Sequence, residues 1–217
     1  MASPSTSDSG RRRRAAPLPP EQRRPMVLDA ALQVYLEHGF ERASMDAIAD
    51  AAGVTKPVLY DCFASKQELF TALWDREEER LLAALAGSLP AEPDFDQPER
   101  MIAHGFTAFF SAIRSAPDAY RLILLEEQGL APAAARRGNR TRSGQAERIA
   151  AIVRTWLEGR GVPDAERAAR LLGHAMVGMG EALGRLMLAE PGRWEPEELG
   201  AMVGGLVVRG APDGAGR

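Results

Sequence analysis

Apolar side chains recur at three- and four-residue intervals along most of this 217-residue chain, in segments that are separated by glycines and prolines. Such spacing places apolar residues on one face of an α-helix. No segment shows the sustained alternation of apolar and polar residues that marks a half-buried strand, and no internal repeat is visible. The pattern predicts an all-α fold.

Helix boundaries follow from the caps and breakers between these segments. A first helix is expected from about residue 21 or 25 to 38, where Gly39 ends it. Further long helices are expected over 66 to 87 or 90, 98–115, 117 to about 129, 164–190 and 195–209, and around Ile149–Leu157. Residues 131–145, which are rich in Ala and Arg, fit either a flexible basic segment or the start of the helix that follows.

The stretch from Ser44 to Gly53 has the pattern of a short helix followed by a tight turn. Ser44 is a good N-cap, because its hydroxyl can accept a backbone N–H of the first turn. Ile48 and Ala52 lie four residues apart and share a face. Gly53 can take the left-handed conformation that ends a helix.

A second short helix is expected directly after this turn. Thr55 can cap it, and Pro57 falls in its first turn, where the missing N–H does little harm. Leu59 and Phe63 again lie four residues apart and can pack back onto Ile48. The two helices and the turn between them form a helix-turn-helix.

The outer face of the second helix suits DNA. Lys56 and Tyr60 lie on it four residues apart, and the N-terminal residues of such a helix meet base edges and phosphates in the major groove. Lys66 lies just beyond and is expected to meet the DNA backbone. On this pattern alone, an ordinary helical hairpin with a solvated face is the competing interpretation.

Several motifs occur here together at fixed spacing: Gly39-Phe40, Ser44, Ile48-Ala49, Ala52-Gly53-Val54-Thr55-Lys56, Leu59-Tyr60, Phe63 and Ser65-Lys66-Gln67-Glu68-Leu69. Over roughly residues 23–73, this combination closely resembles the DNA-binding domain of the tetracycline-repressor (TetR) family of bacterial regulators. The resemblance implies an N-terminal three-helix DNA-binding domain with a helix-turn-helix. A larger helical domain that binds ligands and forms dimers would follow it.

The same resemblance implies a function. The chain would be a ligand-responsive transcriptional regulator, most often a repressor, that binds a palindromic double-stranded DNA operator as a homodimer. A small-molecule effector, which the sequence does not identify, would release it from DNA. The positions that match DNA contacts in the family are Ser44, Thr55, Lys56, Pro57, Val58, Tyr60 and Lys66.

Three positions depart from the family pattern. Pro57 stands where glycine is frequent, although proline also occurs. Asp61 puts a negative charge on the second helix, where it can accept from a cytosine amino group or lie off the DNA. Cys62 replaces an aromatic or histidine that can reach the backbone, so a small semi-buried thiol is expected there.

The chain is expected to divide into four parts: a disordered basic tail (1–20), the helix-turn-helix domain (21–69), a helical ligand-binding and dimerisation domain (70–210) and a frayed C-terminus (211–217). The tail carries Arg11–Arg14. It is either a basic arm that follows a groove or the phosphates, or a solvated tail without a role.

The overall charge does not resemble that of a simple nucleic-acid binder. The net charge is −3 and the pI is about 5.7, whereas a basic patch is usual in such proteins. DNA binding must therefore rest on local placement of charge. This acidity supports the alternative function, a helical ligand-binding or scaffolding dimer without specific DNA recognition.

The single cysteine excludes an internal disulfide and fits a reducing cytoplasm. No apolar run has the length of a membrane span, so a cytoplasmic protein without a membrane partner is expected.

No catalytic residue, metal or cofactor is expected. The three histidines, His38, His104 and His174, show no ligand spacing. His104 and His174 lie on mostly apolar helices, where a hydrogen-bonded core histidine is expected first, a pocket lining second and metal ligation a distant third. There is no glycine-rich phosphate loop and no nucleophile elbow.

Large or flexible apolar side chains gather in the C-terminal half. Such residues line apolar pockets between helices, although the helical spacing of each alone fits an ordinary core. With the resemblance, they become candidate effector contacts: Met101, Phe106, Phe109, Phe110, Tyr120, Trp156, His174 and Met176.

Two late helices are unusually rich in small residues. The segment 173–184 contains four glycines, Gly173, Gly178, Gly180 and Gly184, and each glycine lowers helix propensity. Close helix–helix approach explains them, and the resemblance implies a four-helix dimer interface; internal packing in one monomer is the alternative. The candidate interface residues are Gly180, Gly184, Met202, Gly205 and Leu206.

Overall fold

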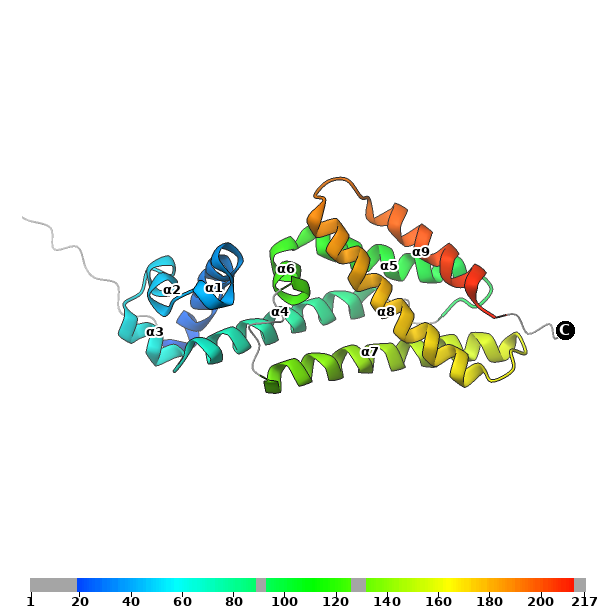
Figure 1. Cartoon of the computed structure of the whole chain (residues 1–217), viewed down its shortest axis with the longest axis horizontal. Coiled ribbons are helices and arrows are strands. Elements are labelled where there is room, and N and C mark those ends of the chain that lie inside the picture. The colour runs from blue at the N-terminus through cyan, green and yellow to red at the C-terminus, as the bar shows by residue number, and fades with distance from the viewer. Residues whose placement is uncertain (1–18, 89–92, 126–131, 213–217) are drawn as a thin grey trace, which may run out of the picture.

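The computed structural model describes residues 19–88, 93–125 and 132–212, and these residues form helices and turns without a strand. The helices α1 (Pro20–Arg42), α2 (Met45–Ala51) and α3 (Lys56–Cys62) lie at one end of an elongated molecule (Figure 1). The helix α4 (Lys66–Ser88) leaves this group and runs toward the other helices. The all-α prediction is confirmed for the described residues.

The three N-terminal helices enclose a small core with the first half of α4. Every member is apolar and nearly inaccessible to solvent: Val27, Ala31, Tyr35, Ile48, Leu59, Phe63, Leu69, Phe70 and Leu73. The Phe70 ring meets the Tyr35 and Phe40 rings edge-on, each at a centroid distance of 4.9 Å. Leu59 and Phe63 are buried as predicted, although Phe63 has extended backbone and lies just after α3.

Five helices form the C-terminal part: α5 (Pro98–Ser115), α6 (Pro117–Leu125), α7 (Pro132–Gly159), α8 (Ala165–Ala189) and α9 (Pro196–Gly210). The helix α5 packs along α9, and α7 packs along α8. The first contact is very close: a Cβ added at Gly204 would lie 2.6 Å from the Glu99 carbonyl oxygen, and one at Gly200 would lie 2.7 Å from that of Ala103. These glycines of α9 therefore serve packing within the chain.

The predicted helix boundaries hold to within a few residues, with two informative differences. Residues 132–145 are helical and open α7, so the basic-segment alternative is wrong for them. Gly39 takes a φ of 72° and ends the regular helix, as predicted, but a short helical turn that was not predicted follows to Arg42. The expected tail (1–20) and frayed C-terminus lie almost entirely outside the described residues.

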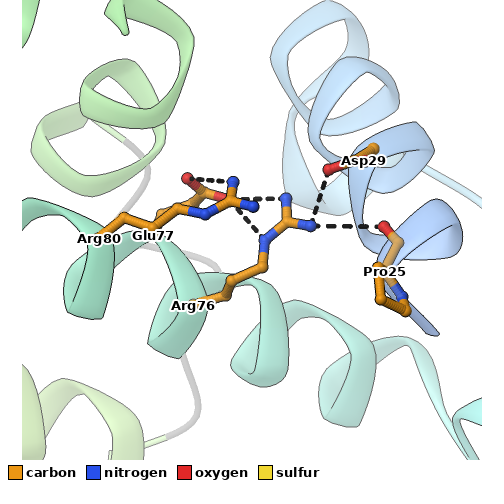
Figure 2. A network of polar contacts seen from close by, with 5 residues as sticks. All are labelled: Pro25, Asp29, Arg76, Glu77 and Arg80. Atoms are coloured by element: carbon orange, nitrogen blue, oxygen red, sulfur yellow. Dashed lines mark hydrogen bonds and ion pairs between the residues drawn. The ribbon is translucent and has the colours of Figure 1, made fainter. Parts of the chain in front are cut away.

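A polar network fastens α4 to α1 (Figure 2). Arg76 pairs with Asp29 of α1 at 2.8 Å, and the same guanidinium lies 2.6 Å from the Glu77 carboxylate. Glu77 is only 2% exposed, and Arg80 pairs with it from its other side at 3.1 Å. The buried carboxylate thus lies between two arginines, one of which reaches the N-terminal domain.

Candidate nucleic-acid interface

The turn between α2 and α3 is fixed by local hydrogen bonds. The Ser44 hydroxyl accepts the Ala47 N–H at 3.1 Å, which confirms the predicted N-cap of α2. Gly53 takes a φ of 64°. The Val54 N–H then bonds the Ala49 carbonyl at 3.0 Å, and the Gly53 N–H bonds that of Asp50 at 3.1 Å. This pair of bonds is the Schellman motif, which turns the chain sharply after a helix.

The start of α3 differs from its prediction in one detail. Thr55 occupies the N-cap position with extended backbone, and its carbonyl accepts the Leu59 N–H at 3.0 Å. Its hydroxyl makes no capping hydrogen bond, so the expected side-chain cap is absent. The side chain is exposed instead, together with Lys56 and Pro57 in the first turn of α3.

One side of α3 faces solvent and the other enters the core. Leu59 and Cys62 are buried, whereas Tyr60 is 44% exposed and Asp61 is exposed. Val58 is partly buried. The predicted contact residues on α3 thus share the exposed N-terminal part of the helix, and the Cys62 thiol is withdrawn from it.

Lys56 has an acidic neighbour on α2. Its ammonium lies 2.8 Å from an Asp46 carboxylate oxygen, and both side chains are exposed. The hydrogen bond and charge of Asp46 raise the pKa of Lys56 above its ordinary value. Lys56 therefore keeps its positive charge at the N-terminus of α3. An exposed ion pair of this kind is weak, so the Lys56 ammonium can exchange Asp46 for another partner.

Lys66 occupies a different environment. Its ammonium donates to the carbonyl oxygens of Phe40 at 2.8 Å, Ala43 at 3.0 Å and Glu41 at 3.2 Å. It also lies 4.5 Å from the centroid of the Phe40 ring. The structure therefore directs this side chain to the end of α1, whereas the sequence predicted a contact with the DNA backbone.

Arg24 of α1 makes a similar contact at the end of α3. Its guanidinium donates to the Cys62 carbonyl at 2.5 Å and lies 4.2 Å from the centroid of the Phe63 ring. Sequence reasoning did not single out Arg24, because the contact joins residues 38 positions apart. Residues 21–69 contain five Lys and Arg against eight Asp and Glu, so internal use of two cations leaves this domain short of positive charge.

The candidate effector residues only partly gather. The Phe109 ring lies 5.5 Å from that of Phe110 and 6.0 Å from that of Tyr120, and Phe106 lies 5.9 Å from Phe110. Met176 and Trp156 are buried, and Met101 is partly buried. The Trp156 ring belongs to the same buried apolar core as the ring cluster and lies 5.0 Å from the Arg160 guanidinium.

The expectation that His104 and His174 are core histidines is wrong. His174 is exposed on α8 and its Nδ1 lies 3.0 Å from the Arg170 carbonyl of the preceding turn. His104 is exposed on α5. Neither is a core histidine, because the polar side of each helix faces solvent at that position. His174 therefore does not line the ring cluster.

Three buried polar atoms in the described residues have no hydrogen-bond partner, and one of them, Arg76 Nη2, lies 2.6 Å from the Glu77 carboxylate in an ion pair. The other two are the Tyr120 hydroxyl and the Trp74 indole N–H, on side chains that are 3% and 4% exposed. Burial raises the pKa of Tyr120, so the phenol stays protonated. An orphaned hydroxyl beside the ring cluster is a ready donor for a ligand, and no sequence signal marks it.

The candidate dimer residues separate into two groups. Gly180 faces the Phe106 and Phe109 rings, at 3.4 and 3.5 Å from an added Cβ, and Gly184 is buried as well. Gly205 lies beneath the Arg209 guanidinium. Gly180 and Gly184 are buried within the chain, so the expectation that they face a second copy is wrong. Gly205 is covered by the Arg209 side chain of its own helix, and its place in the dimer interface stays a prediction.

Met202 and Leu206 are 46% and 54% exposed on α9, so they remain accessible to a second copy of the chain. Gly180 and Gly184 were misassigned because spacing identifies a shared face without showing what covers it. A line of exposed residues on α8 was overlooked: Leu171, Ala175, Gly178 and Ala182.

The N-terminal domain is similar to a known family of regulatory proteins. Residues 27–73 match the family model described as "Bacterial regulatory proteins, tetR family". The chain is 40% identical over 115 residues to the HTH-type transcriptional activator FasR of Mycolicibacterium smegmatis, a match that covers 53% of this chain and 51% of FasR. The chain thus spans about half the length of that relative.

Two solved structures resemble the whole fold. A TetR-like transcriptional regulator from Rhodococcus sp. RHA1 superposes with a TM-score of 0.69 at 28% identity, covering 89% of this chain and 98% of that one. The regulator FadR of Bacillus subtilis, solved in complex with stearoyl-CoA, superposes with a TM-score of 0.67 at 17% identity, covering 86% and 98%. The second likeness concerns the fold alone.

Two further observations concern the described residues. No group of three His, Cys, Asp or Glu side chains is arranged to hold a metal ion there. None of the helices in the described ranges is both long and apolar enough to cross a membrane.

Proposed function

Since the chain belongs to the TetR family of bacterial regulatory proteins, we propose that it is a dimeric transcriptional regulator that binds a palindromic DNA operator and is released by a small molecule. Members of this family regulate transcription and are not enzymes. The observation that carries the proposal is the helix-turn-helix, in which α3 exposes its N-terminal turn while its other side is buried in the domain core.

Major-groove entry follows from that exposure. The N-terminal residues of a recognition helix reach base edges, and neighbouring side chains and N–H groups position it on phosphates. Thr55, Lys56, Pro57 and Tyr60 are exposed there, with Val58 partly so. Lys56 and Tyr60 supply a cation and a hydroxyl for phosphates, and the smaller residues allow close approach to bases.

Dimerisation is required because one helix-turn-helix makes few base contacts. Two recognition helices must span about one helical turn of DNA, ~34–36 Å, or a multiple of it. The exposed face formed by Leu171 and Gly178 of α8 and by Met202 and Leu206 of α9 is the surface we assign to the second copy. The oligomeric state of a variant with a charge on this face tests the assignment.

The effector is proposed to bind beside the ring cluster of α5 and α6. Its chemistry is an apolar body that fits against Phe106 and Phe109, with an acceptor for the Tyr120 hydroxyl. The family's frequent repressor role stays a prediction for this chain, because FasR is named an activator.

The alternative is a helical ligand-binding dimer without DNA recognition, which the excess of acidic residues in positions 21–69 favours. A gel-shift assay with genomic fragments adjoining the gene separates the two. The proposal expects a discrete shifted band that survives excess random-sequence duplex. The alternative expects no shift at moderate salt, although the protein is folded and dimeric.

A further inference from the structure

The Lys66 ammonium donates hydrogen bonds to three backbone carbonyl oxygens. Its three partners, the carbonyls of Phe40, Glu41 and Ala43, come from the last turn of α1 and its C-cap. These carbonyls follow the break at Gly39, and the last carbonyls of a helix have no partner within it. An ammonium has three N–H donors, so these three bonds use its whole donor capacity.

These contacts fix the point at which the helix-turn-helix begins. Ala43 is followed directly by Ser44, which caps α2. Lys66 is itself the first residue of α4, and its own carbonyl accepts the hydroxyl of buried Tyr35 at 3.3 Å. One residue thus joins the end of α1, the start of α2 and the start of α4.

The start of α4 is firmly held by other bonds. The Ser65 hydroxyl accepts the Glu68 N–H at 3.1 Å, and the Glu68 carboxylate accepts the Ala64 N–H at 2.9 Å. This reciprocal arrangement resembles a capping box. The backbone of Lys66 is therefore held in a rigid helical turn, and this fixes the position of its ammonium.

We propose that Lys66 is a positioning residue: it holds the end of α1 against α4 and so sets the placement of α2 and α3 for DNA, without contacting a phosphate itself. The proposal rests on the proposed DNA-binding function for its consequence. Its structural part, the joining of α1 to α4, stands independently of DNA.

Arginine at this position discriminates between the two roles. A guanidinium is planar and binds phosphate well, whereas the three carbonyls surround a compact ammonium with rotatable donors. If Lys66 bound phosphate, Lys66→Arg would act as the wild type. If it positions the helix-turn-helix, Lys66→Arg and Lys66→Met fail together.

Three measurements on the full-length protein decide the question. The first is the thermal midpoint, by circular dichroism. The second is the labelling rate of Cys62, the single cysteine, whose buried thiol at the end of α3 reports loosening of that helix. The third is the affinity for a random-sequence 30-bp duplex over a series of NaCl concentrations, well below the thermal midpoint. Lys56→Ala is the matched control, because Lys56 is exposed on α3 itself.

We expect Lys66→Met and Lys66→Arg to lower the midpoint by about 2–8 °C, since each leaves carbonyls without their donor. Cys62 labelling becomes several-fold faster in both. DNA affinity falls, but the slope of log affinity against log salt stays that of the wild type. Lys56→Ala shows the reverse: an unchanged midpoint and a slope reduced in magnitude by about 0.9.

The proposal is overturned if Lys66→Met keeps the wild-type midpoint and labelling rate while its salt slope falls by about 0.9, with Lys66→Arg restoring the slope. It is likewise overturned if Lys66→Arg matches the wild type in all three measurements. Absence of DNA binding by the wild type would refute the proposed function instead, and the midpoint and labelling results would still decide the role of Lys66 in the fold.

Discussion

At the scale of single residues, Tyr120 combines a buried ring with an unused hydroxyl. The ring packs against Phe109 and the side chain is 3% exposed, but its oxygen has no hydrogen-bond partner. Burying a hydroxyl without a partner costs about 1–3 kcal/mol. A protein retains such a cost where the group serves something other than the ligand-free fold, and here the effector is the proposed reason.

Tyr120→Phe should therefore stabilise the protein. Removing only the orphaned hydroxyl keeps the ring and raises the free energy of unfolding by about 1–3 kcal/mol. Denaturant unfolding measures this directly. Tyr35→Phe is the matched control, because the Tyr35 hydroxyl is also buried but donates to Lys66, so this variant should lose stability. A loss of stability in Tyr120→Phe would show that its hydroxyl is satisfied in solution.

The sequence predicts residues well where the deciding contact is local. The Ser44 cap and the left-handed Gly53 each depend on neighbours within three residues, and both were predicted. Lys66 has the same sequence spacing as a phosphate ligand, yet its carbonyl partners lie 23–26 residues away. Only the packing of α4 against α1 reveals that they surround it.

At the scale of elements, α4 runs from the N-terminal helices into the C-terminal ones (Figure 1), and part of the polar network that joins it to α1 is buried. Glu77 is 2% exposed between Arg76 and Arg80, whereas the Asp29 partner of Arg76 is 68% exposed. Removing one member of a buried pair leaves an uncompensated charge and costs about 3–5 kcal/mol. An exposed pair contributes about 0–1 kcal/mol.

Glu77→Ala and Asp29→Ala should consequently differ sharply. We expect Glu77→Ala to lower the free energy of unfolding by about 3–5 kcal/mol, because the mostly buried Arg76 loses its buried partner and keeps only the exposed Asp29. Asp29→Ala should cost less than about 1 kcal/mol. Equal costs for the two variants, in urea unfolding at the same ionic strength, would mean that burial does not govern this network.

Helices could be predicted from the sequence because their caps and breakers are local, as α5 shows by running from Pro98 to Ser115 as expected. The element that packs against each helix face could not be predicted from the sequence. Gly180 and Gly184 share a face of α8, but only the structure shows α5 rings against Gly180. The small residues of α9 likewise accommodate α5, and the apolar residues left outside are Met202 and Leu206.

At the scale of the whole molecule, dimerisation has to hold two N-terminal ends at a fixed separation. Leu206→Glu places a charge on the exposed face of α9 without disturbing the core, since this side chain is 54% exposed. We expect the variant to shift toward monomer in analytical ultracentrifugation and to lose operator binding, with an unchanged helical content.

Ile152→Glu is the matched control for that experiment, because Ile152 is an exposed apolar residue on α7, 37% accessible and outside the assigned face. It should leave the dimer intact. The opposite pattern, with Ile152→Glu monomeric and Leu206→Glu dimeric, would move the interface to α7.

The distribution of charge along the whole chain predicts a role in DNA binding for the arginine-rich segment Arg11–Arg14. Residues 21–69 carry more acidic than basic residues, and Arg11–Arg14 are the nearest concentrated positive charge in the sequence. Deleting residues 1–20 should weaken binding to a random-sequence duplex and flatten its salt dependence. The thermal midpoint should stay within about 1 °C, because no described core residue is removed. Identical affinity in the truncated protein would assign the segment no role in DNA binding.

The central claim is that two copies of α3 read a symmetric DNA site. The direct test is selection of genomic fragments from the source organism by the purified protein, followed by sequencing and by a parallel selection with Tyr60→Ala. We predict enrichment of one inverted repeat, with half-site centres about one helical turn of DNA, ~34–36 Å, or a multiple of it apart. Tyr60→Ala should recover the same site less efficiently, because a phosphate contact positions without reading sequence. Fragments without a shared symmetric sequence, from a protein that is folded and dimeric, would contradict the account.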